Sequence, residues 1–148
     1  MTRRMVIAVL ALGGVFLATY LLLYKLGFIP GLACGSGDCE VVQSSKWAVF
    51  LGFPVALWGV LFYAAMFVVA SAGSFGALAE SHAVGRLLTA ISGWGVLFSS
   101  WLTYLELAEI HAICRFCVVS ALLAAGLFAL SVRDYRLNAA EQGAIGTE

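Results

Sequence analysis

Long apolar stretches separated by short polar ones dominate the pattern along the chain, and their length is that of a bilayer-crossing helix. Such a helix needs about 20 apolar residues. Four stretches fit, at about 5–24, 54–71, 87–110 and 114–132. The second begins at Pro54, and proline suits the first turn of a helix. The pattern therefore predicts an all-α membrane protein, a bundle of four transmembrane helices in a lipid bilayer.

The polar segments between these stretches predict one long loop and two short ones. The long loop covers residues 25–53, between the first and second stretches. The sequence shows no internal repeat, and we expect residues 1–137 to form one transmembrane domain. Residues 138–148 are polar, and we expect a short mobile tail there. Gly14 and Ala18, four residues apart in the first stretch, predict close contact with another helix.

Basic residues are distributed unequally between the two sides of this four-span layout. The side shared by the termini carries Arg3, Arg4, Arg86, Arg133 and Arg136. The other side carries Lys25, Lys46 and Arg115. Because Lys and Arg are more frequent in cytoplasmic segments, we expect cytoplasmic termini in a multi-pass protein of the cell (inner) membrane. The first stretch is longer than the about 7–15 apolar residues of a signal peptide, so we expect it to stay in place as an anchor.

The overall composition agrees with a membrane protein and argues against nucleic-acid binding. Hydrophobic residues make up 63% of the 148 residues and charged residues 11%, against about 45–50% and about 25% in soluble domains. A globule of this size could not hide so much apolar surface from water. The 8 basic and 8 acidic residues give a formal net charge of +0, so no excess of positive charge favours a nucleic-acid partner.

The four cysteines form two pairs, Cys34 with Cys39 in the long loop and Cys114 with Cys117 at the start of the fourth span. The predicted topology places all four on the extracytoplasmic side, where disulfides persist. The second pair is a Cys-x-x-Cys at an expected helix N-terminus, where free N–H groups and the helix dipole favour a thiolate. Arg115 adds a positive charge beside it. These surroundings are typical of a reactive pair.

Three interpretations of the cysteines remain open at this point. The first is a redox relay, in which two electrons pass from an external dithiol to the loop pair, then to the helix-end pair through mixed disulfides, and finally to a lipid-soluble oxidant. The second is a membrane protein that handles a soft metal ion with thiolate ligands, although the spacing fits a zinc site poorly. The third is a structural role only, with inert disulfides or packed thiols.

The cysteine pairs occur together with further sequence features that point to a known family. A serine, Ser45, follows Cys39 by six residues. The segment 52–63 reads Gly-Phe-Pro-Val-Ala-Leu-Trp-Gly-Val-Leu-Phe-Tyr at the start of the second span. Together with Cys114-x-x-Cys117 at the start of the fourth span, these features make the chain resemble the vitamin K epoxide reductase family, specifically its bacterial disulfide-forming members.

The resemblance implies a fold and a reaction. The fold would be a four-helix bundle around a quinone (ubiquinone, menaquinone or similar), capped by the loop and by a short interfacial helix before the second span, for which Val41–Leu51 is the expected segment. The reaction would be that of a thiol:quinone oxidoreductase that reoxidises a thioredoxin-like, DsbA-type protein outside the cytoplasm. Some bacterial members carry a fused thioredoxin domain, whereas here we expect the partner to be a separate protein.

The resemblance also implies a role for each matching residue. Cys34 would take electrons from the partner, Cys39 would relay them to Cys114, and Cys117 would face the quinone. Ser45 would donate a hydrogen bond to the quinone, which a neutral hydroxyl can do as negative charge develops on a carbonyl oxygen.

Two positions depart from the vertebrate members of the family. Val55 stands where they carry an asparagine, and Ala121 stands where they carry a tyrosine. Both polar groups are tied to vitamin K binding in the family. Their replacement here favours reduction of an ordinary quinone over reduction of a quinone epoxide.

Aromatic residues near the loop and the second span are further candidates for quinone contacts. Trp47 and Trp58 could form an aromatic wall for the ring, or belong to the interfacial belt in which tryptophan gathers at membrane boundaries. We expect the remaining aromatic residues of this region to pack in the bundle: Phe50, Phe62, Trp94 and Trp101.

Three titratable residues cluster at the outer end of the third span: Glu106, Glu109 and His111. Reduction of a quinone consumes two protons, and this cluster could deliver them. The alternative is that these groups are simply solvated at the membrane surface.

Overall fold

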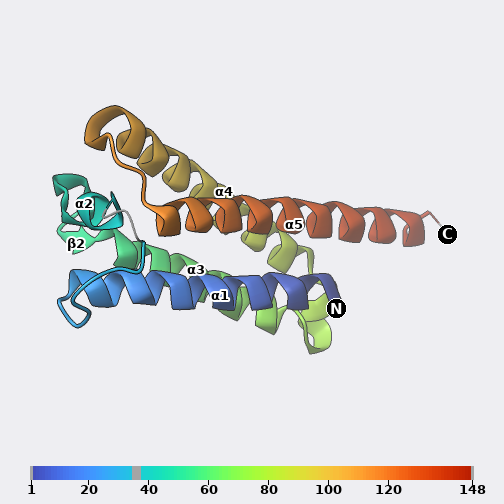
Figure 1. Cartoon of the computed structure of the whole chain (residues 1–148). Coiled ribbons are helices and arrows are strands. Elements are labelled where there is room, and N and C mark those ends of the chain that lie inside the picture. The colour runs from blue at the N-terminus through green and yellow to red at the C-terminus, as the bar shows by residue number, and fades with distance from the viewer. Residues whose placement is uncertain (1, 35–37, 148) are drawn as a thin grey trace.

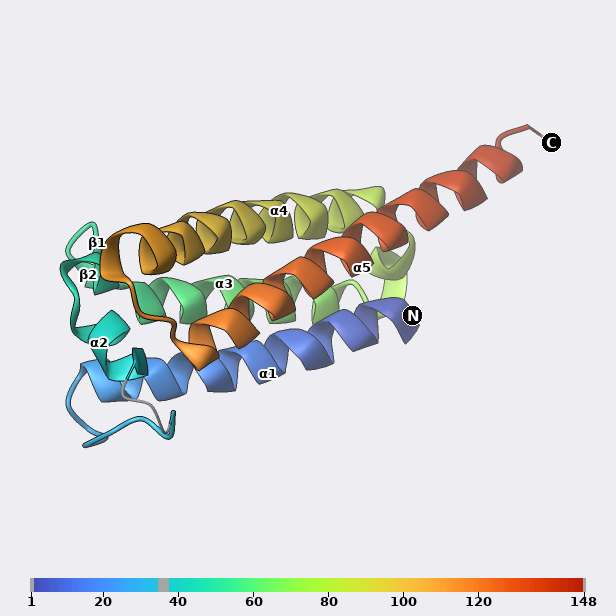
Figure 2. The same cartoon turned by 45° about the horizontal axis from the view of Figure 1, so that its top comes forward.

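Four long helices make up most of the described chain. The computed structural model describes residues 2–34 and 38–147. The long helices are α1 (Thr2–Lys25), α3 (Val55–Ala72), α4 (His82–Leu105) and α5 (Arg115–Ile145). Helix α1 contacts α3 and α5, and α4 also contacts α3 and α5, so the four helices form a closed ring of neighbours (Figures 1 and 2). The expected helical architecture is confirmed to this extent.

Three of these helices are long and apolar enough to cross a membrane: Arg3–Lys25, Val55–Ala72 and Arg115–Ile145. Large apolar side chains also lie exposed on the outer surface of the long helices, including Phe16, Leu61, Leu97 and Leu122. Exposed apolar surface of this kind suits contact with lipid rather than water. The three helices indicate a membrane protein.

Helix α4 is not one of these three, and serine and threonine residues interrupt its apolar sequence. Each of four hydroxyl groups donates a hydrogen bond to a carbonyl oxygen of the preceding turn of the same helix; they belong to Thr89, Ser92, Ser100 and Thr103. This back-bonding satisfies the hydroxyl groups within the helix. A fourth membrane span in this region stays a prediction.

The segment between α1 and α3 differs from the expected interfacial helix at Val41–Leu51. A short helix, α2, covers Asp38–Ser44, and Ser45 then adopts an extended backbone. A 3-10 turn (Lys46–Ala48) leads into a small hairpin of β1 (Val49–Phe50) and β2 (Phe53–Pro54). Leu51 and Gly52 both have positive φ angles, 54° and 82°, as the tight turn of a two-residue hairpin requires. The helix therefore begins and ends earlier than predicted.

The bundle packs tightly where small residues allow it. A Cβ atom added at Gly14 on α1 would overlap the ring of Tyr63 on α3. Ala18, one turn further along α1, is 5% exposed, and the Cβ position of Gly59 on α3 approaches its methyl group to 3.4 Å. The close helix contact predicted from Gly14 and Ala18 is confirmed.

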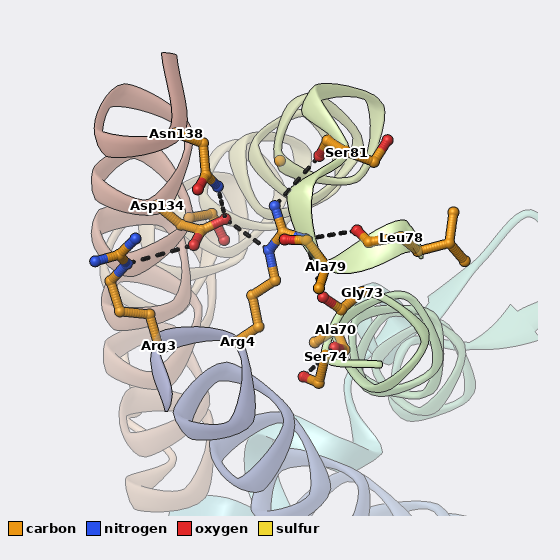
Figure 3. A network of polar contacts seen from close by, with 12 residues as sticks. Arg3, Arg4, Ala70, Gly73, Ser74, Leu78, Ala79, Ser81, Asp134 and Asn138 are labelled. Atoms are coloured by element: carbon orange, nitrogen blue, oxygen red, sulfur yellow. Dashed lines mark hydrogen bonds and ion pairs between the residues drawn. The ribbon is translucent and has the colours of Figure 1, made fainter. Parts of the chain in front are cut away.

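The end of the bundle near the N-terminus is held by a buried ionic cluster (Figure 3). Arg4, 1% exposed, donates from Nε to Oδ2 of Asp134 at 2.9 Å, and Nδ2 of Asn138 donates to the same oxygen at 3.1 Å. The other guanidinium nitrogens of Arg4 donate to carbonyl oxygens of the α3–α4 connection, which contains the 3-10 helix η2 (Gly76–Glu80): Gly73, Leu78, Ala79 and Ser81. Arg4 thus joins α1, α5 and this connection.

Helix α5 continues into the polar segment that was expected to be a mobile tail. The helix runs without a break from Arg115 to Ile145, so most of the segment 138–148 is helical. Asn138 is 9% exposed and bonded to Asp134. The predicted boundary at residue 137 therefore falls inside a helix, and Asn138 belongs to the buried cluster.

Candidate active site

The four cysteines gather at the end of the bundle opposite the N-terminus, beside α2 and the hairpin (Figure 1). Cys34 and Cys39 form a disulfide, whereas Cys114 and Cys117 are free thiols. The sulfur atoms of Cys34, Cys39 and Cys114 all lie within 4.8 Å of one another. These three cysteines are almost completely buried in one apolar cluster with residues such as Leu21, Val42 and Ala56. The structure therefore brings together two cysteine pairs that are distant in the sequence.

The polypeptide reaches Cys114 through an unusual connection after α4. A π-helical turn, η3, covers Glu106–Ile110, and His111 then adopts the left-handed conformation with φ 58° and ψ 30°. π-Helical turns are rare and often occur at functional sites. Cys114 lies directly before α5 in an extended conformation, and its N–H donates to Oε2 of Glu106 at 3.1 Å. Cys117 lies in the first turn of α5, as the Cys-x-x-Cys pattern predicted.

The electrostatic surroundings of Cys114 favour its thiolate form. The pKa of the Cys114 thiol is lowered from its ordinary value, chiefly because the Cys117 thiol donates a hydrogen bond to its sulfur. Backbone N–H groups of Phe116 and Cys117 lower this pKa further, while burial and the negative charge of Glu106 raise it. A thiol of low pKa is a good leaving group in disulfide exchange, so Cys114 is suited to leave from a mixed disulfide with a neighbouring cysteine.

The three titratable residues predicted as a cluster are separated by the structure. Glu106 is 5% exposed and accepts the N–H of Cys114. Glu109 and His111 are exposed. The buried carboxyl group of Glu106 therefore belongs to the cysteine site, and the other two side chains face away from it.

Gln43 is a site residue that sequence reasoning missed. It lies on α2, is 7% exposed, and its Nε2 donates to Sγ of Cys117 at 3.6 Å. Its main-chain oxygen accepts a hydrogen bond from Nζ of Lys25 at 2.8 Å, which ties α2 to the end of α1. Gln43 follows Cys39 by four residues, so both lie on one face of α2. That spacing was the available signal.

A cavity of about 270 Å³ adjoins Cys117. It lies between α1, α3, α4 and the start of α5, and most of its lining is apolar. Aromatic side chains contribute a large share: Phe50, Trp58, Phe62, Trp94 and Phe98. Polar groups from Gln43, Glu106 and Cys117 meet at the end near the cysteines. An apolar cavity with a few convergent polar groups is the usual form of a small-molecule site.

The cavity lining agrees with some sequence predictions and differs from others. Trp58, a candidate for an aromatic wall, lines the cavity, and its Nε1 donates to the main-chain oxygen of Phe50 at 3.1 Å. Phe50, Phe62 and Trp94 were expected only to pack in the bundle, yet they line the cavity as well. Val55 also lines it.

Ser45 and Trp47, two of the predicted quinone contacts, lie beside a different depression on the outer surface. This depression is lined by both residues together with Glu40, Lys46 and Glu109. The Ser45 hydroxyl donates to the main-chain oxygen of Val42 at 2.7 Å. Trp47 packs edge-on against Trp101 with ring centroids 6.4 Å apart. Neither residue lines the cavity next to Cys117.

A comparison with known families adds an independent finding. The sequence model of the Vitamin K epoxide reductase family matches residues 5–132. The matched range contains both cysteine pairs, Gln43, Glu106 and all the cavity-lining residues. The chain therefore belongs to the vitamin K epoxide reductase family and is an oxidoreductase with thiol-based redox chemistry.

Proposed function

We propose that the protein is a thiol:quinone oxidoreductase that reoxidises a thioredoxin-like, DsbA-type protein and passes the electrons to a membrane quinone. One observation carries the proposal. Cys114 lies within 4.8 Å of the sulfurs of the Cys34–Cys39 disulfide, and its partner Cys117 lines an apolar cavity. The two cysteine pairs thus connect the loop, where a protein dithiol can react, with a site for an apolar acceptor.

The proposed electron path consists of two exchange reactions. The partner dithiol first reduces the Cys34–Cys39 disulfide. The Cys39 thiolate then attacks Cys114 of an oxidised inner pair and releases Cys117, and Cys34 attacks Cys39 to restore the loop disulfide and free Cys114. The products are a loop disulfide and two inner thiols, which is the redox state of the structure. In this state the two electrons are held by the inner pair.

The proposed acceptor site is the cavity beside Cys117. A quinone has a flat ring, and Trp58 with the neighbouring aromatic side chains offers flat apolar surfaces to it. Of the four residues predicted to bind the quinone, Trp58 and Cys117 line this cavity. Ser45 and Trp47 border the outer depression, so their proposed contact requires the segment 45–47 to move. Val55 in the lining offers no amide, which supports an ordinary quinone rather than an epoxide as the substrate.

The proposed orientation places the cysteines outside the cytoplasm and the termini inside, in the cell (inner) membrane. The greater number of arginines at the ends of the chain supports this orientation. Cys34 is 3% exposed, so the partner must displace the groups that cover it before its thiolate reaches the disulfide. We therefore expect the partner to bind the loop surface rather than to react by simple collision.

The test is quinone absorbance during a single turnover of the purified protein with excess dithiothreitol. The wild-type protein should convert quinone to quinol. Cys117→Ala should leave the quinone signal unchanged, because it removes the thiol next to the cavity. A wild-type protein that leaves the quinone unchanged would contradict the proposal.

A second candidate function, handling of a soft metal ion, has one supporting observation. Three cysteine sulfurs lie close enough together to share an ion, and thiolates prefer soft metals. Two of these sulfurs are joined in a disulfide, so this function requires the loop pair to be reduced. Metal analysis of the reduced protein, together with the quinone assay, separates the two candidates.

A further inference from the structure

Glu106 is a buried carboxyl group that is bonded to Cys114 and shares a cavity with Cys117. Its side chain is 5% exposed and accepts the N–H of Cys114 at 3.1 Å. It also lines the cavity at the end next to Cys117. Burial of a carboxyl group is costly unless its hydrogen bonds are satisfied. The backbone contact fixes the position of the carboxyl group in the lining of the cavity that Cys117 also lines.

The thiol of Cys117 must lose its proton before its sulfur can react. The carboxyl group of Glu106 lines the same cavity as this thiol and accepts the N–H of Cys114, the other cysteine of the pair. Gln43 approaches the sulfur of Cys117, but an amide has no ionisable proton at neutral pH. The hydroxyl of Tyr63, another lining residue, is already hydrogen-bonded to Ser120. Glu106 is therefore the group placed to take the Cys117 proton.

We propose that Glu106 carries a proton from the Cys117 thiol to an oxygen of the quinone. The proposal rests on the proposed thiol:quinone function and assigns its proton path. In the step, the S–S bond between Cys114 and Cys117 forms, and two electrons pass to the quinone. The Cys117 proton moves through the Glu106 carboxylate to one quinone oxygen. Cys114 is already a thiolate and has given its proton to water. The second quinone oxygen takes up one proton from water, so the quinol formed is neutral.

The test measures two reactions of the Glu106→Gln variant separately: reduction of its cysteines by dithiothreitol, and formation of quinol by the reduced protein. Glutamine keeps an oxygen that can accept the Cys114 N–H but cannot carry a proton. One assay mixes the reduced protein, freed from excess dithiothreitol, with a short-chain ubiquinone and follows quinone absorbance by stopped flow. The other mixes the oxidised protein with dithiothreitol and follows the free thiols. Glu109→Gln is the matched control, because Glu109 lies one turn away and is exposed.

We expect Glu106→Gln to slow quinol formation about 100-fold, within the range of about 10²–10⁴ for general acid–base catalysis. Reduction by dithiothreitol should keep its wild-type rate, and Glu109→Gln should behave as wild type in both assays. An unchanged rate of quinol formation in Glu106→Gln, or equal slowing of both reactions, would overturn the role of Glu106. A wild-type protein that forms no quinol would instead overturn the proposed function.

Glu106→Asp provides the test if the glutamine variant does not fold. Aspartate keeps a carboxyl group but withdraws it by one methylene from the Cys117 thiol. We expect slower quinol formation with unchanged reduction by dithiothreitol. Equal slowing of both reactions would show a positioning role only and would overturn the proposal.

Discussion

Cys114 is the residue at which the two cysteine pairs meet. Its sulfur is buried against the Cys34–Cys39 disulfide, while its position directly before α5 exposes it to the N–H groups of the first helical turn. The hydrogen bond from Cys117 is the largest of the effects that lower its pKa. In the proposed relay Cys114 is thus the thiolate that leaves when the loop disulfide forms again, and Cys117 controls how easily that thiolate forms.

This dependence predicts how the pKa of the Cys114 thiol changes when Cys117 is replaced. The comparison uses a background in which Cys34 and Cys39 are both replaced by alanine and the remaining thiols are reduced. Cys114 should ionise below about pH 8.5, the ordinary value for cysteine. Cys117→Ala should raise this midpoint, because the hydrogen bond is lost while burial and the Glu106 charge remain.

Cys117→Ser is the matched control, since a serine hydroxyl can still donate to the Cys114 thiolate. In the serine variant, the ionisation midpoint of Cys114 should be closer to its value in the protein that keeps Cys117 than to its value in the alanine variant. Ultraviolet absorbance of the thiolate against pH measures all three proteins. Identical midpoints for the serine and alanine variants would show that the hydrogen bond does not set the pKa of Cys114.

At this scale, the sequence identified the residue types but not all of their positions in space. The Cys-x-x-Cys spacing was sufficient to place Cys114 and Cys117 at the start of a helix. It could not separate buried Glu106 from exposed Glu109, because that difference depends on the π-helical turn and on the left-handed residue His111. Ser45 lies outside the cavity because its extended backbone ends α2, a local choice that the sequence pattern did not reveal.

Among the elements, helices α1 and α3 pack closely against each other. Gly14 leaves room for the ring of Tyr63, which is 1% exposed. The Tyr63 hydroxyl reaches on to α5 and donates to the main-chain oxygen of Ser120 at 2.7 Å. One aromatic side chain of the cavity lining therefore joins three helices, and its position depends on the missing side chain at Gly14.

Gly14→Ala should consequently destabilise the bundle. The added methyl group has to displace the Tyr63 ring, and overpacking of this kind costs about 1–3 kcal/mol. Gly13→Ala is the matched control, because no atom lies within 4 Å of a Cβ at Gly13. Thermal unfolding in detergent measures both variants. Equal melting temperatures for the two would contradict the packing described here.

Apolar length was enough to predict where the long helices lie, since the pattern of 20-residue stretches follows directly from burial in lipid. The predicted interfacial helix at Val41–Leu51 was only partly right. Its second half pairs as β1 and β2, which depends on a turn with positive φ at Leu51. Leucine rarely adopts this conformation, so the residues themselves gave no sign of the hairpin.

The whole molecule has a polar cluster at each end of an apolar bundle. The cysteines, Gln43 and Glu106 occupy one end, and Arg4 with Asp134 and Asn138 occupies the other (Figures 1 and 3). Arg4 and Asp134 are 130 residues apart in the sequence. Arginine near the N-terminus was interpreted as a topology signal, and only the folded chain shows that Arg4 is buried. No local pattern could have predicted this pair.

The Arg4 cluster should be important for stability and not for electron transfer. Asp134→Ala leaves the buried guanidinium of Arg4 without its counter-charge, and loss of one partner of a buried ion pair costs about 3–5 kcal/mol. Arg3→Gln is the control, because Arg3 is 40% exposed and lies 3.5 Å from Asp134, where an ion pair contributes about 0–1 kcal/mol. Denaturant unfolding followed by tryptophan fluorescence compares the two, and equal losses would contradict this account.

The most direct test of the relay is to count the quinols that the fully reduced protein forms after excess dithiol is removed. The four cysteines then hold four electrons, and each quinol takes two. The wild-type protein should form two quinols per chain, the variant with Cys34 and Cys39 replaced by alanine should form one, and Cys117→Ala should form none. One quinol per wild-type chain would show that the loop pair does not pass electrons to the inner pair, and would contradict the relay.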